Sequence, residues 1–282
     1  MAEKTTVIIE SGATKSEWRV LDKEGRQINQ CFLPGMNVSA MSLEEVQRIL
    51  SEGFASLGLG ELSGFYLYTA GVLSPDIAAA LEGQIRSLCR VDEIDIQNDL
   101  MGAARAVCGH EAGIAAILGT GANCCFYDGK TLSRKVYSGG YILGDEGSAA
   151  TLGKRFLADY LKGLVPKSLS DDFAREFGAS YEGIVQRVYH SPAPSAFLGS
   201  LAPLILRHFD EPYAKALVEG NFRDFIERFL LRYDTAAYPV GITGGFGWAC
   251  RDMLRPLCEK AGIRISRFVQ APIEGLCRYH LE

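Results

Sequence analysis

The stretch VIIESGATKSEWRVLD, residues 7–22, places a polar, glycine-bearing connection between two short apolar runs. Apolar runs on both sides of such a turn are typical of a β-hairpin, for which an Asn-Gly or Asp-Gly turn would suffice. Here Gly12 and Ala13 would leave backbone N–H groups uncovered. Thr14 and Lys15 add further donors and a positive charge, which favours a phosphate site. A polar surface turn whose hydroxyl groups bind their own backbone is the alternative.

The same plan recurs in IAAILGTGANCCFYDGKTL, residues 114–132, as an apolar strand, a Gly/Thr turn and a second strand. In this copy Gly119–Asn123 falls where Gly12–Lys15 falls in the first. A shorter variant, YPVGITGGF, predicts a strand Val240–Thr243 that runs into Gly244-Gly245. Three glycine-rich turns at strand ends favour the phosphate interpretation.

The segments between these turns predict an α/β chain. SLEEVQRILSEGFASLG is a helix with Ser42 and Glu45 as a capping box, and PDIAAALEGQIRSLC is a helix that Pro75 opens. EIDIQNDLMGAARAVCG predicts a strand, then Asn98 and Asp99, then an alanine-rich helix.

Composition excludes several classes of partner. The chain of 282 residues is 48% hydrophobic and 22% charged, which is typical of a globular protein. Its formal net charge of −5, without a stripe of Lys and Arg, argues against nucleic acid. No apolar run is long enough for a membrane span, and the first residues lack the apolar core of a secretory signal.

The cysteines indicate a reducing compartment. Eight cysteines include no Cys-x-x-Cys pair, and four histidines stand apart from one another. Reduced, mostly buried thiols in a cytoplasmic protein are therefore expected. Metal ligands that only the fold brings together remain open.

Asp99 is the first candidate for chemistry, because it follows a predicted strand and precedes a helix. In an open α/β sheet, side chains at the carboxyl ends of strands project into the crevice where ligands bind. This position suits a general base. The alternative is that Asp99 N-caps a helix that starts at Leu100, and both roles are compatible.

A second candidate is the acidic turn GDEGS at residues 144–148, which opens a predicted helix. It places two carboxylates between glycines, where a substrate hydroxyl could approach the backbone closely. The preference of a helix dipole for acidic residues at its N-terminus is the alternative. Capping alone does not call for glycines on both sides, which favours a binding role.

The standard nucleotide-binding motifs are absent. The segment GSAATLGKR lacks the spacing of a P-loop and has Arg155 where Ser or Thr would hold magnesium. Each G-x-G in the chain lacks the third glycine of a dinucleotide fingerprint. The arrangement that remains is a phosphate group held by two facing β-hairpins.

A resemblance to a known family rests on five segments in this order: residues 10–16, 98–99, 118–123, 144–148 and 243–245. The chain resembles the sugar kinase/Hsc70/actin superfamily and, within it, the N-acetylglucosamine kinase and BadF-type ATPase branch. The resemblance implies an α/β, two-lobed actin-like ATPase (ribonuclease H-like) fold with an interdomain cleft. It implies a first lobe at 1–110, a second lobe with a helical insertion at 111–271, and a closing helix, 272–282, that returns to the first lobe.

The resemblance also implies roles for individual residues. The outer phosphates of ATP would face Gly12, Ala13, Thr14, Lys15, Gly119, Thr120 and Gly121, and the nucleoside would lie against Gly244 and Gly245. The sugar would be bound by Asn37, Gly71, Asp99, Asn123 and Asp145. Asp99 would be the base that accepts the proton of the sugar hydroxyl.

One residue departs from the family pattern. The family usually opens its first hairpin with Asp, which helps to hold Mg²⁺ through water, and this chain has Glu10 there. Glu keeps the charge but is one methylene longer, which puts the placement of Mg²⁺ in question. The function implied is ATP-dependent phosphorylation of an amino sugar, N-acetylglucosamine at its 6-hydroxyl.

Two other functions stay open at this point. An ATPase of BadF type would use hydrolysis to drive a partner, and a non-catalytic regulator would sense a sugar phosphate on the same fold. The expected partners are a small-molecule sugar and ATP, and not nucleic acid or a membrane. Large apolar helices in the second lobe leave room for a homodimer.

Overall fold

The computed structural model describes residues 4–12, 14–178 and 180–281. Contacts divide the chain into two compact units, each built on one five-stranded sheet. Unit 1 is Met1–Glu111 with Gly129–Thr131 and Ala271–Glu282, and unit 2 is Ala112–Asp128 with Leu132–Gln270.

The sheet of unit 1 has the strand order β3-β2-β1-β4-β5. Its strands are β1 (Thr5–Ser11), β2 (Lys15–Leu21), β3 (Gln27–Pro34), β4 (Leu62–Thr69) and β5 (Val91–Asn98). The first three are antiparallel, and β4 and β5 run parallel to β1. Ser11, Thr69 and Asn98 lie in one row of the register. Three strands therefore end together at one edge.

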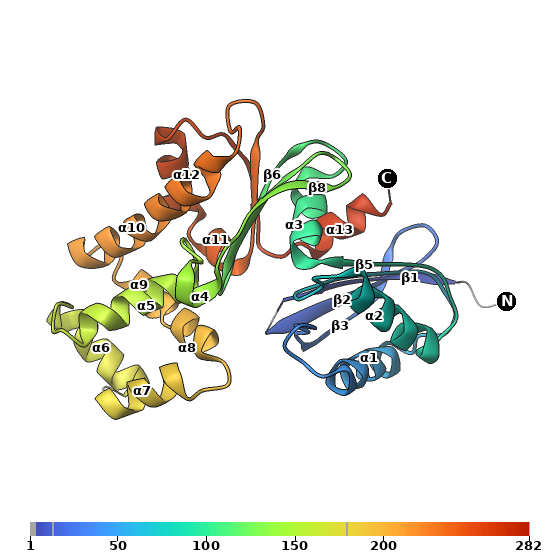
Figure 1. Ribbon diagram of the computed structural model, residues 1–282, viewed down its shortest axis with the longest axis horizontal. Coiled ribbons are helices and arrows are strands. Elements are labelled where there is room, and N and C mark those ends of the chain that lie inside the picture. The colour runs from blue at the N-terminus through green and yellow to red at the C-terminus, as the bar shows by residue number, and fades with distance from the viewer. Residues whose placement is uncertain (1–3, 13, 179, 282) are drawn as a thin grey trace. The chain divides into compact units, whose positions relative to one another are not determined.

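Helices cover both faces of this sheet: α1 (Leu43–Leu57), α2 (Pro75–Leu88), α3 (Asp99–Cys108) and α13 (Ile273–Tyr279). Figure 1 shows α1 and α2 on one face, and α3 and α13 on the other. The predicted capping box is confirmed, since Ser42 Oγ accepts from Glu45 N at 3.2 Å and Glu45 Oε2 accepts from Ser42 N at 2.9 Å. Pro75 opens α2 as predicted.

The C-terminal helix α13 packs against α3 within unit 1. A Cβ on Gly275 would lie 2.4 Å from Ala106 O, so the close approach of the two helices requires glycine there. Beyond α13, His280 Nε2 lies 2.8 Å from Tyr68 Oη, and Arg105 Nη1 donates to the same Tyr68 Oη at 2.6 Å. Burial and the charge of Arg105 lower the pKa of His280 to about 4, so the ring stays neutral at pH 7.

Unit 2 repeats the plan of unit 1, with the strand order β10-β9-β6-β7-β8. Its strands are β6 (Gly113–Leu118), β7 (Ala122–Tyr127), β8 (Leu132–Val136), β9 (Val240–Thr243) and β10 (Ile265–Val269). Three strands are antiparallel, and β9 and β10 run parallel to β6. The predicted internal repeat is confirmed, as are the bounds predicted for the strand Val240–Thr243.

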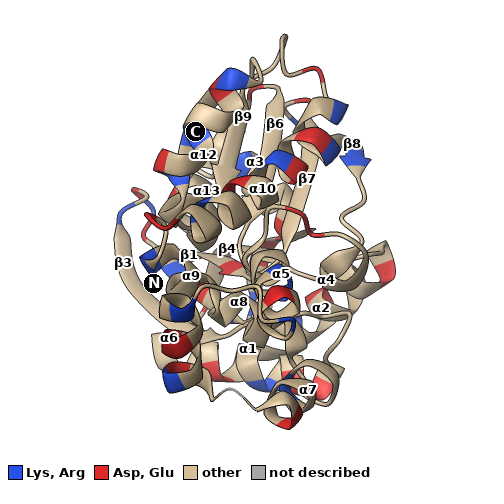
Figure 2. Cartoon of the chain, turned by 90° about the vertical axis from the view of Figure 1, so that its left-hand side faces the viewer, with Lys and Arg blue, Asp and Glu red and all other residues tan. Residues whose placement is uncertain are grey.

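Helices make up the rest of unit 2. They are α4 (Gly140–Leu143), α5 (Ala149–Tyr160), α6 (Lys167–Phe177), α7 (Tyr181–Tyr189), α8 (Pro194–Ser200), α9 (Ala202–Arg207), α10 (Pro212–Arg228), α11 (Gly245–Ala249) and α12 (Arg251–Lys260), with a 3₁₀ turn at Leu230–Arg232. In Figure 2 basic and acidic segments are interspersed along these helices. Over the described ranges of the chain, no helix has the length and apolar character that crossing a membrane requires.

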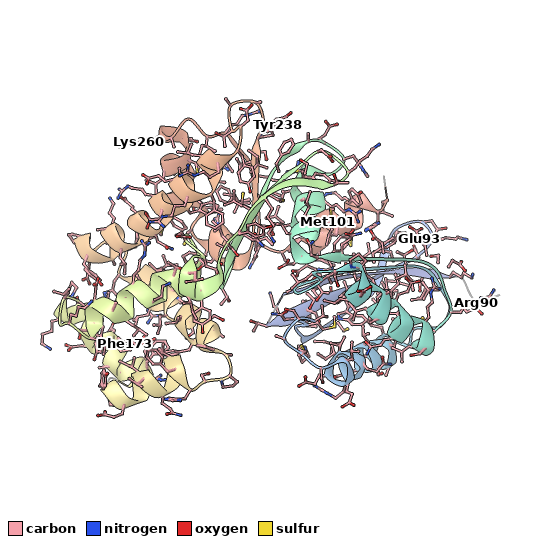
Figure 3. All side chains as sticks on the ribbon, in the orientation of Figure 1. Arg90, Glu93, Met101, Phe173, Tyr238 and Lys260 are labelled. Atoms are coloured by element: carbon pink, nitrogen blue, oxygen red, sulfur yellow. The ribbon has the colours of Figure 1, made fainter. Side chains whose placement is uncertain are left out.

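The helical part of unit 2 has an aromatic core. Phe173 on α6 is fully buried, and Figure 3 shows it pointing in among the helices of this unit. Its ring centroid lies 4.5 Å from that of Tyr160 and 5.3 Å from that of Phe156, both on α5. This packing joins α6 to the helix that begins at the acidic turn.

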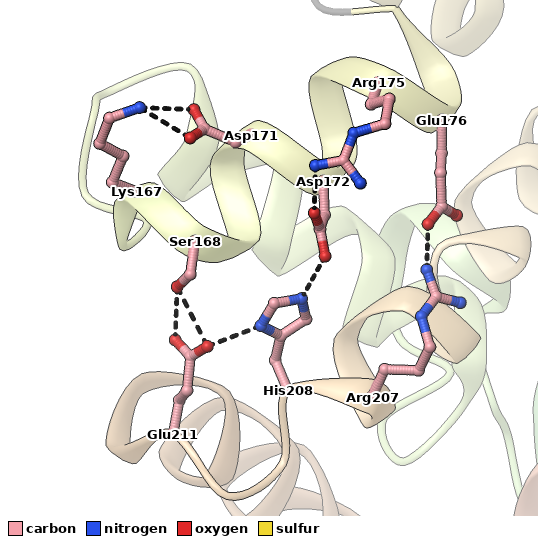
Figure 4. Close-up of polar contacts among 9 residues, drawn as sticks. All are labelled: Lys167, Ser168, Asp171, Asp172, Arg175, Glu176, Arg207, His208 and Glu211. Carbon is pink, nitrogen blue, oxygen red and sulfur yellow. Dashed lines mark hydrogen bonds and ion pairs between the residues drawn. The ribbon is translucent and has the colours of Figure 1, made fainter.

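A polar cluster ties α6 to the segment between α9 and α10 (Figure 4). His208 Nδ1 lies 2.6 Å from Glu211 Oε1, and His208 Nε2 lies 3.0 Å from Asp172 Oδ2. Ser168 Oγ donates to Glu211 Oε2 at 2.9 Å. Both ring nitrogens face carboxylates. These contacts raise the pKa of His208, and the hydrogen bond to Glu211 has the largest effect.

Candidate functional site

The first hairpin closes more tightly than its sequence predicts. Ser11 pairs with Ser16, and Gly12 N donates to Lys15 O at 3.1 Å. The expectation that Gly12 leaves its N–H uncovered is therefore wrong, because the turn uses this donor itself. Ala13 lies outside the described residues. The side chains of Thr14 and Lys15 are exposed at the turn, which leaves them as its candidate ligand donors.

Two buried hydroxyls organise the carboxyl edge of unit 1. Ser11 Oγ accepts from Met36 N at 2.7 Å, and Thr69 Oγ1 donates to Met36 O at 2.7 Å. The chain after β3 is thereby held against the ends of β1 and β4. Sequence reasoning missed both hydroxyls, although a small polar residue that ends a buried strand is the signal that could have found them.

Asn37 and Gly71, two predicted sugar-binding residues, lie side by side at this edge. Asn37 forms a parallel bridge to Ala70. Gly71 has a φ of +86°, and a Cβ on it would lie 2.4 Å from Asn37 Oδ1. The same Asn37 Oδ1 accepts from Ser39 Oγ at 2.9 Å, which fixes the orientation of the amide. Glycine is thus required at position 71 for two reasons: the positive φ of the backbone and the close approach of the Asn37 amide.

Asp99 is the first residue of α3, and the cap of this helix is Asn98. Asn98 Oδ1 accepts from Met101 N at 2.8 Å, while Asp99 Oδ1 accepts from Leu100 N at 2.9 Å. The alternative that Asp99 N-caps a helix starting at Leu100 is therefore wrong. The capping is done by its neighbour, and the Asp99 carboxyl group stays at the carboxyl end of β5.

Glu10 shares this part of unit 1 with Asp99. Burial and the negative charge of Asp99 raise the pKa of Glu10 to about 7, and Lys15 opposes the shift. Two carboxyl groups that repel each other form a donor set that a divalent cation stabilises, and Mg²⁺ typically binds through one or two carboxylates, water and substrate phosphates. The residues present therefore fit a magnesium ion held through water.

The described parts of the chain contain no cluster of three or more His, Cys, Asp or Glu side chains arranged to hold a metal ion. Burial raises the pKa of the Cys250 and Cys258 thiols to about 12, so both stay protonated at neutral pH. These two thiols are packing residues of unit 2.

The second hairpin is fixed by the N-terminus of α5. Ala149 N donates to Gly119 O and Ala150 N donates to Thr120 O, each at 3.0 Å. Gly119 N donates to Gly121 O at 3.0 Å, so this glycine also uses its N–H inside the turn. The hairpin turn and the helix start thus satisfy each other's backbone groups.

Two of the predicted nucleotide-binding glycines, Gly119 and Gly245, border open space. A Cβ on either would meet no atom within 4 Å, and neither has a positive φ. Neither the backbone conformation nor a protein neighbour therefore requires glycine at these two positions. Gly244 differs, because its φ is +113° and a Cβ on it would lie 2.4 Å from Leu118 O.

The acidic turn precedes α5 and is not part of it. Ser148 is the N-cap, with its Oγ accepting from Thr151 N at 3.1 Å, and the helix begins at Ala149. The helix-dipole alternative is therefore wrong, because both carboxylates lie outside the first turn. Glu146 Oε1 instead pairs with Arg228 Nη1 at 3.1 Å.

Asp145 lies against the second hairpin. Its carboxyl group accepts hydrogen bonds from Ala122 N and the Ser138 side chain, and a Cβ on Gly121 would lie 3.0 Å from Asp145 Oδ2. Asp145 is 8% exposed, and this burial raises its pKa to about 6. Unit 2 thus brings a predicted sugar-binding residue into contact with the predicted phosphate hairpin.

Asn123 and Thr243 complete the polar groups of unit 2. Asn123 Oδ1 accepts from Cys124 N at 3.1 Å on β7. Thr243 Oγ1 is buried and has no hydrogen-bond partner among the described residues. Thr243 belongs to the segment 243–245 that carries the family resemblance, but the sequence assigned no role to its side chain.

Comparison with known proteins finds relatives that are named as kinases of amino sugars. No protein-family model matches the chain. The N-acetylmuramic acid/N-acetylglucosamine kinase of Clostridium acetobutylicum is 27% identical over 215 residues, which cover 72% of this chain and 70% of that protein. A proposed N-acetylglucosamine kinase from Porphyromonas gingivalis is 35% identical, with 98% of each chain covered and a TM-score of 0.90.

A more distant structure shares the fold alone. A ROK-family glucokinase from Streptomyces griseus, solved with glucose and AMPPNP, is 16% identical, with 98% of this chain and 97% of that chain covered and a TM-score of 0.57. The architecture is that of the actin-like ATPases and sugar kinases. The chain belongs to the N-acetylglucosamine kinase branch of the sugar kinase/Hsc70/actin superfamily, as its motifs indicate.

Proposed function

We propose that this protein transfers a phosphoryl group from ATP to an amino sugar, with the 6-hydroxyl of N-acetylglucosamine as acceptor. The observation that carries the proposal is the position of Asp99 at the carboxyl end of β5, where Asn98 does the capping. Asn37 and Gly71 are held at the carboxyl edge of the same sheet. A carboxylate beside hydroxyl-binding groups suits the activation of an alcohol.

The proposed roles in unit 1 follow from this edge. Asp99 accepts the proton of the attacking hydroxyl, and Asn37 orients the sugar beside Gly71. Thr14 and Lys15 bind phosphate oxygens through their exposed side chains. Gly12 gives the turn its shape and does not donate its N–H to phosphate, since Lys15 O accepts it.

The proposed roles in unit 2 are complementary. Thr120 and Gly121 bind phosphate oxygens, Asn123 and Asp145 bind sugar hydroxyls, and the open space beside Gly245 receives the nucleoside. ATP supplies the phosphoryl group, and Mg²⁺, held by Glu10 through water, offsets the charge of its phosphates. Phosphoryl transfer depends on alignment and charge neutralisation, which is what these side chains provide.

We also propose that residues 1–110 with 272–282, and residues 111–271, act as the two lobes of the kinase. We place the activity in the cytoplasm, because ATP is supplied there and thiols such as Cys250 and Cys258 stay reduced there.

A coupled ADP-release assay with ATP, Mg²⁺ and a panel of sugars tests the function. The panel contains N-acetylglucosamine, N-acetylmuramic acid, N-acetylmannosamine and glucose. The proposal predicts ADP release that requires an amino sugar. ATP turnover without any sugar would indicate an ATPase, and binding without turnover would indicate a sensor.

A further inference from the structure

The turn that carries Asp145 has a backbone that few residues adopt. Asp145 has a φ of 56°, the only positive φ of a non-glycine residue in the part of the chain that the structure describes. Gly147 has a φ of +86°, and a Cβ on it would lie 2.5 Å from Phe225 Cβ. Such conformations persist only where the surroundings hold them.

One side chain from a distant helix holds this turn. Asn221 on α10 is fully buried; its Oδ1 accepts from Gly147 N at 3.1 Å, and its Nδ2 donates to Ser148 O at 3.0 Å. The amide therefore satisfies one donor and one acceptor of adjacent residues. A carboxylate could only accept, and a hydrocarbon could do neither.

The stability of α10 alone does not explain an amide at this position. Val218, Phe222 and Phe225 are fully buried in the same core. Asn is a weaker helix former than Leu, and burial of an amide carries a desolvation cost that only matched partners offset. The two backbone groups of the turn are those partners.

Two further contacts hold the same turn. Arg228, the last residue of α10, pairs with Glu146, and Thr151 Oγ1 donates to Asp145 O at 2.8 Å. Residues of α10 thus contact three successive residues of the turn, from Glu146 to Ser148. In the turn held by these contacts, the carboxyl group of Asp145 lies beside Gly121.

We infer that Asn221 is a positioning residue for sugar recognition, which fixes Gly147 and Ser148 so that Asp145 presents its carboxyl group beside the β6–β7 turn. The inference rests on the proposed function, in which Asp145 binds a sugar hydroxyl. Asn221 itself does not touch the substrate.

Two variants and one control test the inference. Asn221→Asp keeps the size and the acceptor but sets an oxygen against Ser148 O, and Asn221→Ser shortens the side chain so that both bonds are lost without overcrowding. The control is Tyr213→Phe on the same helix, which loses a hydrogen bond of 2.9 Å to Asp159 Oδ2 and does not contact the turn. Circular dichroism and thermal unfolding check that each variant folds.

The kinetic measurement compares the change in the KM for N-acetylglucosamine with the change in the KM for ATP. We expect the KM for N-acetylglucosamine to rise about tenfold in both Asn221 variants, as the loss of one well-placed hydrogen bond would give, with the KM for ATP unchanged. Tyr213→Phe should leave both values unchanged. Equal rises in both KM values, or failure of both Asn221 variants to fold, would overturn the inference in favour of a structural role.

A second readout does not depend on activity. Carbon-13 NMR of labelled aspartate follows the Asp145 carboxyl group, whose pKa of about 6 reflects burial against the hairpin. We expect this pKa to fall toward the ordinary range in Asn221→Ser and to stay in Tyr213→Phe. Asn221→Asp is left out of this measurement, because its new carboxyl group beside the turn would itself raise the pKa of Asp145. An unchanged Asp145 titration would overturn the inference. If the wild type phosphorylates no sugar, the proposed function fails, and this measurement still decides the role of Asn221.

Discussion

Glu10 and Glu17 are direct cross-strand partners on β1 and β2, so two carboxyl groups share one face of the sheet in unit 1. Arg19 Nε donates to Glu17 Oε1 at 2.8 Å, which compensates one of the two. Burial, the charge of Asp99 and, to a smaller extent, the charge of Glu17 raise the pKa of Glu10 to about 7. The position where the family usually has Asp is therefore an acid that gains a proton close to neutral pH.

Replacement of Glu10 tests this electrostatic arrangement. The folded state binds the Glu10 proton more tightly than the unfolded state does, so stability falls as pH rises from about 4.5 to about 7. The shift corresponds to about 3 kcal/mol across that window. Glu10→Gln should remove this part of the pH dependence in urea unfolding without Mg²⁺ or nucleotide. The control Glu61→Gln changes an exposed carboxyl group of the same unit, and a Glu10→Gln profile that matches the wild type would contradict the assignment.

Asp99→Asn tests the proposed base. Loss of a general base typically lowers kcat by about a hundredfold or more. Substrate binding should change little, because Asn keeps the shape and one acceptor. Steady-state kinetics with Asp92→Asn as the control, a surface carboxylate paired with Lys4, makes the comparison. A kcat that stays within about threefold of the wild type would show that another group takes the proton.

Asp145→Asn should separate stability from recognition. Ionised Asp145 is disfavoured in the fold, since its pKa is about 6 against an ordinary 3.8, which corresponds to about 3 kcal/mol above that pH. Asn also accepts a positive φ readily. We expect the variant to unfold at higher urea concentration than the wild type at about pH 8, and to bind N-acetylglucosamine more weakly by calorimetry. Lower stability at that pH would mean that the hydrogen bonds of the carboxylate outweigh its burial.

The stability of the fold should also depend on the protonation of His208, whose pKa is raised by attraction to carboxylates and not, as for Glu10, by burial. The carboxylates of Glu211 and Asp172 face its two nitrogens, with Arg175 beside Asp172, and together they raise the pKa of His208 above its ordinary 6.5. The stability that this cluster adds is present below about pH 6.5 and is lost as pH rises through the raised value. His208→Gln should flatten the fall in melting temperature above that pH, while the exposed His190→Gln should not. Equal slopes in all three proteins would contradict the role of the cluster.

Local signals in the sequence were sufficient for much of the fold. The capping box at Ser42 and Glu45 and the strand Val240–Thr243 were predicted correctly because each depends on neighbouring residues. The sequence offered Asp99 as the N-cap, whereas Asn98 caps α3, because both types of residue cap helices and only the end of β5 selects between them.

The sequence could supply neither the way a glycine-rich turn closes nor the contacts between residues that are distant along the chain. The use of the Gly12 N–H by Lys15 O depends on how the turn closes, and a glycine-rich sequence permits several closures. Asn221 lies 74 residues from Gly147, and no local pattern connects them. In the sequence, Asn221 stands out only as a polar residue at a helix position that faces the core, where an apolar residue is usual.

The most direct test of the proposed reaction is phosphorus-31 NMR of the protein with ATP, Mg²⁺ and N-acetylglucosamine. Transfer to the 6-hydroxyl predicts a new phosphate monoester signal, split by the two protons on carbon 6, that grows as the γ-phosphate signal of ATP declines. A signal split by a single proton would place the phosphate on another hydroxyl. Inorganic phosphate alone, or an ATP spectrum that does not change, would contradict the assignment of a sugar kinase.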